Sequence, residues 1–188
     1  MGFFDDVPPP PPPEPFVEPP RPSWMRSETT IGGAVAGSFL LARSETAAVG
    51  LSGLVAYPNG FEFTVVAVLR DEDRAGRVFD HVFNRFRGDE PLTPQFLRLG
   101  IRFADGGVVT NLSGTPPWDR GADAPMLIGQ SGGGGGRRYD MQHWVHPLPP
   151  PGPVTFVIEW PAYGITETRA TLDGTLIRTA ATQAISLW

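Results

Sequence analysis

The sequence contains no cysteine, which excludes disulfide bonds, thiolate metal sites and a cysteine nucleophile. It also contains no lysine, because all 15 basic residues are arginine. Mechanisms that need a lysine amine, such as Schiff-base chemistry or a Walker phosphate loop, are therefore excluded. With only three histidines present, a metal site would have to be built from histidine and carboxylate ligands alone.

Long apolar runs are also missing. The longest stretch, residues 31–42, is well short of the ~20 residues that a membrane span needs, and it follows prolines instead of a basic amino terminus. We therefore expect no membrane span, no signal peptide and a cytoplasmic location. Twenty acidic residues against 15 basic ones give a net charge of −5. This balance argues against nucleic acid, whose phosphates require a clustered positive surface.

Proline is abundant at the start of the chain and defines its domain organisation. We expect residues 1–23 to form a disordered proline-rich arm and residues 24–188 to form a single domain. The run 8–13 consists of prolines, which favour an extended polyproline helix. Two interpretations stay open. The arm is either an acidic tether or a docking peptide with three aromatic anchors, Phe3, Phe4 and Phe16.

Short runs of alternating apolar and polar residues indicate β-strands. The clearest is residues 61–69, whose odd positions should face the core. It follows Pro58-Asn59-Gly60, a hairpin signal because Asn-Gly tolerates the positive φ of tight turns. The expected strands are residues 34–43, 45–57, 61–69, 96–104, 108–111, 126–130, 139–146, 154–160 and 165–172.

Two segments show helical spacing. Residues 78–86 predict an amphipathic helix that either caps the end of a sandwich or presents Phe79 and Phe83 to a partner chain. Asp173 should cap a closing helix with an apolar face formed by Leu176, Ile177, Ala180, Ala181 and Ala184. The sequence thus predicts an all-β, mainly antiparallel fold. We expect an Ig-like or jelly-roll-like β-sandwich with one or two short peripheral helices.

The stretch 131–160 is the most distinctive part of the chain. Five glycines, residues 132–136, predict a flexible connection, and strands 139–146 and 154–160 should pair across a stiff proline turn. Alternation should turn the odd residues of the first strand toward the core. The outward row is then Arg138, Asp140, Gln142, Trp144 and His146. Either another element covers Trp144, or this row is a binding surface, with Arg137 and Arg138 made adaptable by the glycines.

Two short segments match the residue patterns of catalytic motifs but not the structural context that those motifs require. Asp140, His143 and His146 form D-x-x-H-x-x-H, but on a strand His143 points away from the other two, which lie about 20 Å apart. Residues 129–133 fit G-x-S-x-G, yet the following glycines cannot start the helix that a nucleophile elbow needs. We therefore expect no catalytic residue, no metal and no cofactor.

The segment GGGGGRRYDMQHW, followed by PPPGPVTFVIEWPAYGI, resembles a set of uncharacterised actinobacterial proteins with a proline-rich amino terminus. The resemblance covers most of the chain and implies a bacterial source, without an activity or site residues. Our leading hypothesis is a non-catalytic binding or assembly module that meets another protein, or itself, through a sheet face and the proline-rich arm. The alternatives are a hydrolase or metal-dependent enzyme using His143 or His146 with Asp140, and a carbohydrate-binding sandwich with exposed tryptophans.

Overall fold

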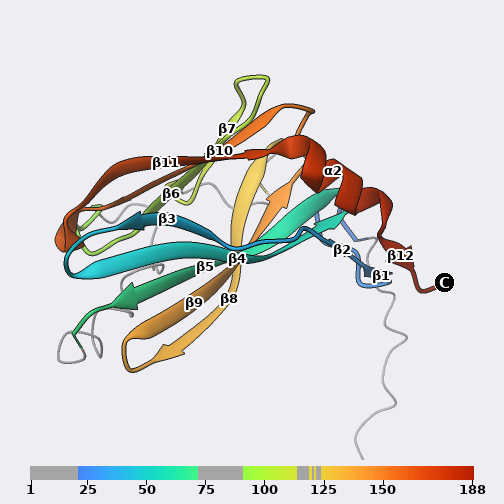
Figure 1. The fold of residues 1–188 in the computed structure, drawn as a ribbon. Coiled ribbons are helices and arrows are strands. Elements are labelled where there is room, and N and C mark those ends of the chain that lie inside the picture. The colour runs from blue at the N-terminus through green and yellow to red at the C-terminus, as the bar shows by residue number, and fades with distance from the viewer. Residues whose placement is uncertain (1–20, 72–90, 114–118, 120, 122–123) are drawn as a thin grey trace, which may run out of the picture.

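Two antiparallel sheets pack face to face in the computed structural model, which describes residues 21–71, 91–113, 119, 121 and 124–188 (Figure 1). At the centre of the larger sheet, β4 (Ala47–Tyr57) and β5 (Gly60–Leu69) form a long hairpin. The odd positions of β5 are all buried, as the alternation predicted: Phe61, Phe63, Val65, Ala67 and Leu69. The sandwich-like, all-β architecture confirms the predicted fold class.

The larger sheet has six strands. Its order is β2 (Gly33–Ala34), β4, β5, β9 (Arg138–His146) and β8 (Met126–Gly135), and β3 (Phe39–Arg43) also pairs with β4. The single strand expected over residues 34–43 is therefore two strands. They are separated by a segment in which Gly37 has φ +114°, a conformation that breaks regular strand geometry.

The smaller sheet has the order β11 (Ile165–Asp173), β10 (Pro153–Trp160), β6 (Arg98–Arg102) and β7 (Val108–Thr110). Its inner face supplies the second half of the core. The alternating apolar residues that form this face are all buried: Leu97, Leu99, Ile101, Phe103, Val154, Phe156, Ile158 and Trp160. Regular alternation identified this face because each strand is buried on one side only.

The prediction that strands 139–146 and 154–160 pair with each other is wrong, because β9 and β10 lie in different sheets. Both edges of β9 are occupied, one by β5 and the other by β8. The proline-rich residues between them lack backbone donors for a hairpin ladder. They carry the chain from one sheet to the other, beginning with a cis peptide bond between His146 and Pro147.

The prediction of a flexible glycine connection is also wrong. The run belongs to β8 and pairs residue by residue with β9, for example Gly132 with Met141 and Gly134 with Tyr139. A Cβ atom on Gly132 would lie 2.7 Å from the Met141 sulfur, so glycine allows the strand to pack closely there. The prediction of flexibility considered only the entropy lost by ordering glycines. The ladder of hydrogen bonds between β8 and β9 offsets that loss.

The hairpin between β4 and β5 forms where it was predicted, with a different turn. Tyr57 pairs with Gly60, so the two turn residues are Pro58 and Asn59, and neither has positive φ. Proline fixes φ at a negative value and favours an ordinary turn conformation. Gly60 is needed for another reason. A Cβ atom there would lie 2.3 Å from the carbonyl oxygen of Val145 and 2.6 Å from the Trp144 ring.

The closing helix, α2 (Gly174–Thr182), covers one end of the sandwich (Figure 1). Asp173 caps it as predicted, since its Oδ1 accepts a hydrogen bond from the Thr175 amide at 2.9 Å. Ile177, Ala180 and Ala181 are buried against the sheet, but Leu176 is 50% exposed and does not belong to the apolar face. The helix expected over residues 78–86 lies outside the described residues.

Two short elements complete the chain. Strands β1 (Thr30–Ile31) and β12 (Ile185–Ser186) form a separate two-stranded ribbon, and a 3-10 turn, η3 (Pro161–Tyr163), links β10 to β11. No helix in the described ranges is long and apolar enough to cross a membrane.

Trp160→Ala should lower the free energy of unfolding by about 3–5 kcal/mol, because it empties a large core site. The side chain is 0% exposed, its ring centre lies 4.3 Å from that of Tyr163, and its Nε1 donates to the Gln95 carbonyl at 2.8 Å. Urea unfolding followed by circular dichroism measures the change. Thr166→Ala, on an exposed position of β11, is the control and should change stability by less than about 0.5 kcal/mol. A loss below about 1 kcal/mol for Trp160→Ala would contradict its place in the core.

Gly60→Ala should destabilise the domain by about 1–3 kcal/mol, since the new methyl group must displace the backbone of β9 or the Trp144 ring. Gly133→Ala is the matched control, because a Cβ atom there meets nothing within 4 Å. The two thermal unfolding midpoints should therefore differ clearly. Equal midpoints would show that the contact between Gly60 and β9 is looser than described.

Candidate functional site

The outward row predicted for residues 138–146 does lie on one face of β9. Val145 pairs with Phe61 and His143 with Phe63, which places the odd residues of β9 on the inner face of the sheet. The even residues, including Trp144, therefore point outward. Alternation alone was sufficient to predict this orientation.

Although Trp144 and His146 point outward from the sheet, their side chains are not exposed to solvent. Trp144 is 1% exposed and His146 7% exposed. The chain near residue 24 covers Trp144. The Trp144 indole donates from Nε1 to the Trp24 carbonyl at 2.8 Å, and the Tyr57 ring lies edge-on at 5.7 Å. The hypothesis that Trp144 and His146 form an exposed binding face is therefore corrected, because Trp144 is covered by another element.

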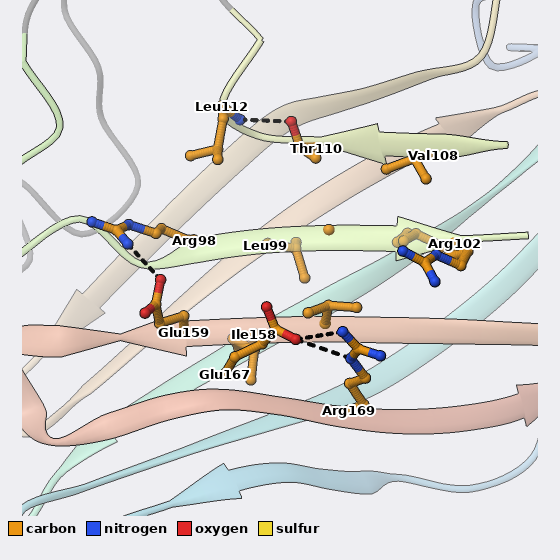
Figure 2. A pocket seen from close by; sticks show the side chains of 13 residues that line it. Arg98, Leu99, Arg102, Val108, Thr110, Leu112, Ile158, Glu159, Glu167 and Arg169 are labelled. Atoms are coloured by element: carbon orange, nitrogen blue, oxygen red, sulfur yellow. Dashed lines mark hydrogen bonds and ion pairs between the residues drawn. The ribbon is translucent and has the colours of Figure 1, made fainter. Parts of the chain in front are cut away.

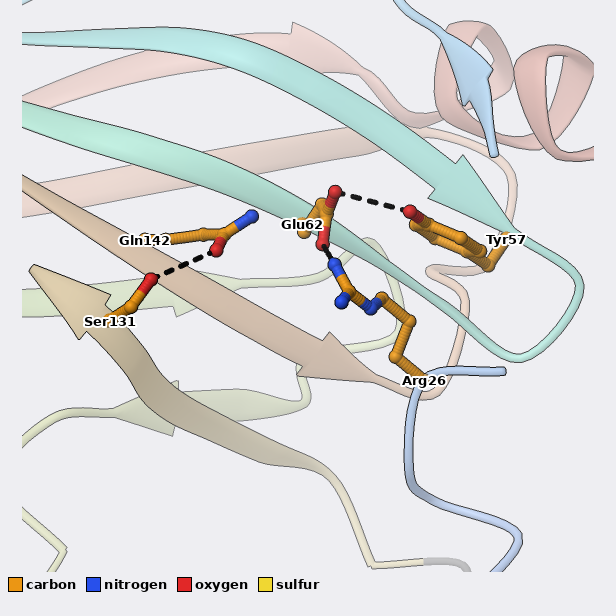
Figure 3. Close-up of polar contacts among 5 residues, drawn as sticks. All are labelled: Arg26, Tyr57, Glu62, Ser131 and Gln142. Atoms are coloured by element: carbon orange, nitrogen blue, oxygen red, sulfur yellow. Dashed lines mark hydrogen bonds and ion pairs between the residues drawn. The ribbon is translucent and has the colours of Figure 1, made fainter. Parts of the chain in front are cut away.

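We call residues 21–27 the amino-terminal strap. The Asn59 side chain donates from Nδ2 to the carbonyl oxygens of Ser23 and Met25, at 2.8 and 2.7 Å. Arg26 donates to the Glu62 carboxylate at 2.5 Å, and the Tyr57 hydroxyl donates to the other carboxylate oxygen at 3.2 Å (Figure 3). Burial and the Glu62 charge raise the pKa of Tyr57 above its usual value. These contacts close this end of the six-stranded sheet.

At the opposite end of the same face, the two arginines that were expected on a flexible loop are held in place. Arg138 forms two hydrogen bonds to Asp140, at 2.8 and 2.9 Å, and Arg137 donates to the Arg70 carbonyl at 3.1 Å. Between the two ends, Ser131 donates to Gln142 at 3.2 Å (Figure 3). Arg138 is thus paired with Asp140, while Arg43, Arg70 and Arg137 line a hollow beside it.

The two histidines of β9 occupy separate environments. His143 is 2% exposed, stacks on Phe63 with ring centres 5.5 Å apart, and donates from Nδ1 to the Met141 carbonyl at 3.1 Å. His146 points to the other side and donates to the Asn59 carbonyl at 2.7 Å. Across the described residues, no three His, Asp or Glu side chains gather as they would around a metal ion. The enzyme alternative therefore gains no support from this pattern.

The tryptophans do not form a stacking platform on either sheet in the described ranges. Trp144 and Trp160 are buried, Trp24 is partly buried in the strap, and Trp188 is 90% exposed beyond β12. Among the described residues the carbohydrate-binding alternative therefore gains no support, and Trp118 lies outside them. Five hypothetical docking residues lie outside the described residues: Phe3, Phe4, Phe16, Phe79 and Phe83.

A groove of about 260 Å³ lies on the outer face of the four-stranded sheet, where the sequence analysis had placed no site (Figure 2). We call it the Gly100 groove. A cross-strand row runs through it, in which Gly100 pairs with Thr110 on one side and Val157 on the other. A Cβ atom on Gly100 would make ordinary van der Waals contacts with its nearest neighbours, at 3.6–3.9 Å, so a side chain could be added there without displacing them. Gly100 and Val157 form an apolar floor.

Charged side chains surround this floor. Arg98 pairs with Glu159 at 2.5 Å, and Arg169 pairs with Glu167 at 2.6 Å (Figure 2). Arg102 is exposed and forms no ion pair within the described part of the chain. The lining therefore holds three arginines against two glutamates, an excess of one positive charge.

One arginine in the groove has spare donor capacity as well. The Nε of Arg98 is buried and has no hydrogen-bond partner among the described residues. Alternation with the buried Leu99 and Ile101 indicates that Arg98 and Arg102 face away from the core, but it does not reveal the hollow between them. The available signal was a glycine at the outward position between two outward arginines. Its neighbours, however, come from strands whose pairing the sequence does not reveal.

His143 should make stability fall as the pH falls from about 6.5 to about 4. Burial lowers its pKa to about 4, so in this range the unfolded chain binds a proton that the folded chain does not. The contribution is complete above pH 6.5, is lost progressively on acidification, and amounts to about 3 kcal/mol. In His143→Phe this component should disappear. Urea unfolding at several pH values measures it, and identical pH profiles for the two proteins would contradict the assignment.

We compared the chain with protein-family models, with curated proteins and with solved structures, and found no match. The case for a function therefore depends on the geometry and charge of the surfaces described above.

Proposed function

We propose that the protein is a non-catalytic binding module that holds an extended, acidic segment of a partner protein in the Gly100 groove. The observation that carries the proposal is the combination of an open apolar floor at Gly100 and Val157 with the unpaired Arg102 beside it. An apolar side chain can fill the hollow while a carboxylate on the same segment meets the arginine.

The size of the groove favours a single side chain of a longer ligand. Small-molecule sites usually measure about 300–1,000 Å³ and enclose most of their ligand. The Gly100 groove is smaller, at about 260 Å³, and lies along the surface of a sheet (Figure 2). An extended peptide can place one side chain in such a hollow and lay its neighbours along the strand.

The charges favour an acidic protein segment over a nucleic acid. Glu159 and Glu167 line the same groove and would repel a run of phosphates. Their charges are compensated by Arg98 and Arg169, which leaves Arg102 for one additional carboxylate.

Selection from a phage library of random linear peptides, with the full chain immobilised, tests the proposal. Enriched peptides should combine an aromatic or aliphatic residue with nearby Asp or Glu residues. Gly100→Leu should weaken their binding about tenfold or more, because the leucine fills the hollow that an anchor side chain needs. Arg102→Gln should weaken binding and reduce its dependence on salt.

Gly133→Leu is the matched control. It places the same side chain on an open strand position of the other sheet, so binding should be unchanged. Peptides that bind Gly100→Leu as tightly as the unmodified protein would place the binding site elsewhere and overturn the proposal. Circular dichroism spectra of the three variants establish that each retains the fold.

A further inference from the structure

The arm contains a sequence that matches the Gly100 groove in both spacing and charge. Glu14, Phe16 and Glu18 alternate with other residues, so an acidic residue lies two positions to each side of an aromatic one. On β6, Arg98 and Arg102 lie two positions to each side of Gly100 on the outer face. In this alignment the largest side chain faces the hollow and one anion faces Arg102, whereas the other anion lies beside the Arg98–Glu159 ion pair.

The distances agree as well. An extended chain rises about 3.1–3.4 Å per residue, so Glu14 and Glu18 are about 12–14 Å apart, and Arg98 and Arg102 have the same separation along β6. Glu14 and Glu18 each precede a proline, which biases them toward extended conformations. Pro15 has no amide hydrogen, which suits a segment that lies across a sheet face without pairing at an edge.

We propose that residues 14–18 of one copy of this chain bind in the Gly100 groove of a second copy. Phe16 lies over Gly100 and Val157, one glutamate pairs with Arg102, and the other lies beside the Arg98–Glu159 ion pair. This inference rests on the proposed function, because it names the segment that the groove holds. It makes the protein a self-associating module.

Geometry places the groove and the segment in different copies. Arg21 forms an ion pair with Glu28, and together with Trp24 and Ile128 it lines a hollow on the outer face of the six-stranded sheet. The Gly100 groove lies on the outer face of the other sheet. Packed sheets are about 10 Å apart, and an outer layer of side chains adds about half of this on each side, so the faces are separated by roughly 20 Å.

The chain is too short to cover this separation. Glu18 is three residues from Arg21 and can reach about 10 Å, while Phe16 is five residues away and can reach about 18 Å. Neither can lie in the groove of its own copy, even along a straight line through the domain. A second copy that approaches the strap can meet both residues.

Charge complementarity favours the same pairing. Residues 1–20 contain four acidic residues and no basic one: Asp5, Asp6, Glu14 and Glu18. The groove has one excess positive charge. This charge favours binding of an acidic segment and predicts that association weakens as salt is added.

Sedimentation equilibrium of the full chain, over a range of micromolar concentrations, tests the inference. The unmodified protein should self-associate, and Phe16→Ala and Gly100→Leu should each raise the dissociation constant about tenfold or more. Phe4→Ala removes an aromatic residue from the same arm, and Gly133→Leu adds a side chain to the other sheet. Both controls should associate like the unmodified protein.

Charge exchange provides a second, independent readout. Arg102→Glu should weaken association, and so should Glu14→Arg or Glu18→Arg. Combining Arg102→Glu with the glutamate replacement that faces it should restore association, because the pair is re-formed with its signs reversed. The combination that restores association also establishes the direction in which the segment lies.

A full chain that remains monomeric at several hundred micromolar, or a Phe16→Ala variant that associates normally, would overturn the inference. Association that depends on Phe16 but is unaffected by Gly100→Leu would overturn it too, since the arm would then bind elsewhere. In each case, library peptides that still require Gly100 would preserve the proposed function with a different partner. If neither self-association nor the binding of library peptides depends on Gly100, both the proposed function and this inference are wrong.

Discussion

The buried carboxylate of Glu62 is the constraint on which much of this structure depends. It lies on the outer face of β5 and is only 7% exposed, and a buried charge is tolerated only when it is paired and hydrogen-bonded. Arg26 and Tyr57 provide that pairing. Because Arg26 lies in the strap, satisfying Glu62 brings the strap onto the sheet, where it covers Trp144. The ion pair between Arg26 and Glu62 thus helps to make this end of the six-stranded sheet interior.

The sequence was sufficient to predict what depends on local periodicity. The core faces of β5, β6 and β10 follow from alternation, and the Asp173 cap and its helix follow from local hydrogen-bonding chemistry. Strand pairing could not be predicted in the same way. The chain neighbours β9 and β10 belong to different sheets, because the best partners for β9 were distant in sequence. The glycine run was wrongly predicted to be flexible for a related reason. The entropy lost by ordering a glycine is a local property, whereas its benefit in close packing depends on residues elsewhere in the chain.

The candidate site shows the same difference between what local periodicity predicts and what depends on contacts distant in sequence. Alternation correctly placed Trp144 on the outer face and Arg98 and Arg102 on theirs, but orientation does not determine exposure. Exposure of Trp144 depends on Trp24, which is 120 residues away. The hollow at Gly100 likewise requires β7, β10 and β6 to be adjacent. The sequence was therefore sufficient to assign single residues to one face of a strand. Predicting a cavity, or which residues another segment buries, requires knowledge of the tertiary structure.

The glycine run of β8 has a further consequence, for how the strand tolerates change. A shift of one residue in a normal strand exchanges its buried and exposed side chains, which fixes the register. Residues 132–135 have no side chains to exchange, so their pairing with β9 is set from outside the run. It is set by Leu127 and Ile128 at one end, by the irregularity between Gly129 and Ser131, and by the turn at Gly136. One glycine more or fewer would alter the turn or create a bulge, without exchanging buried for exposed side chains within the run.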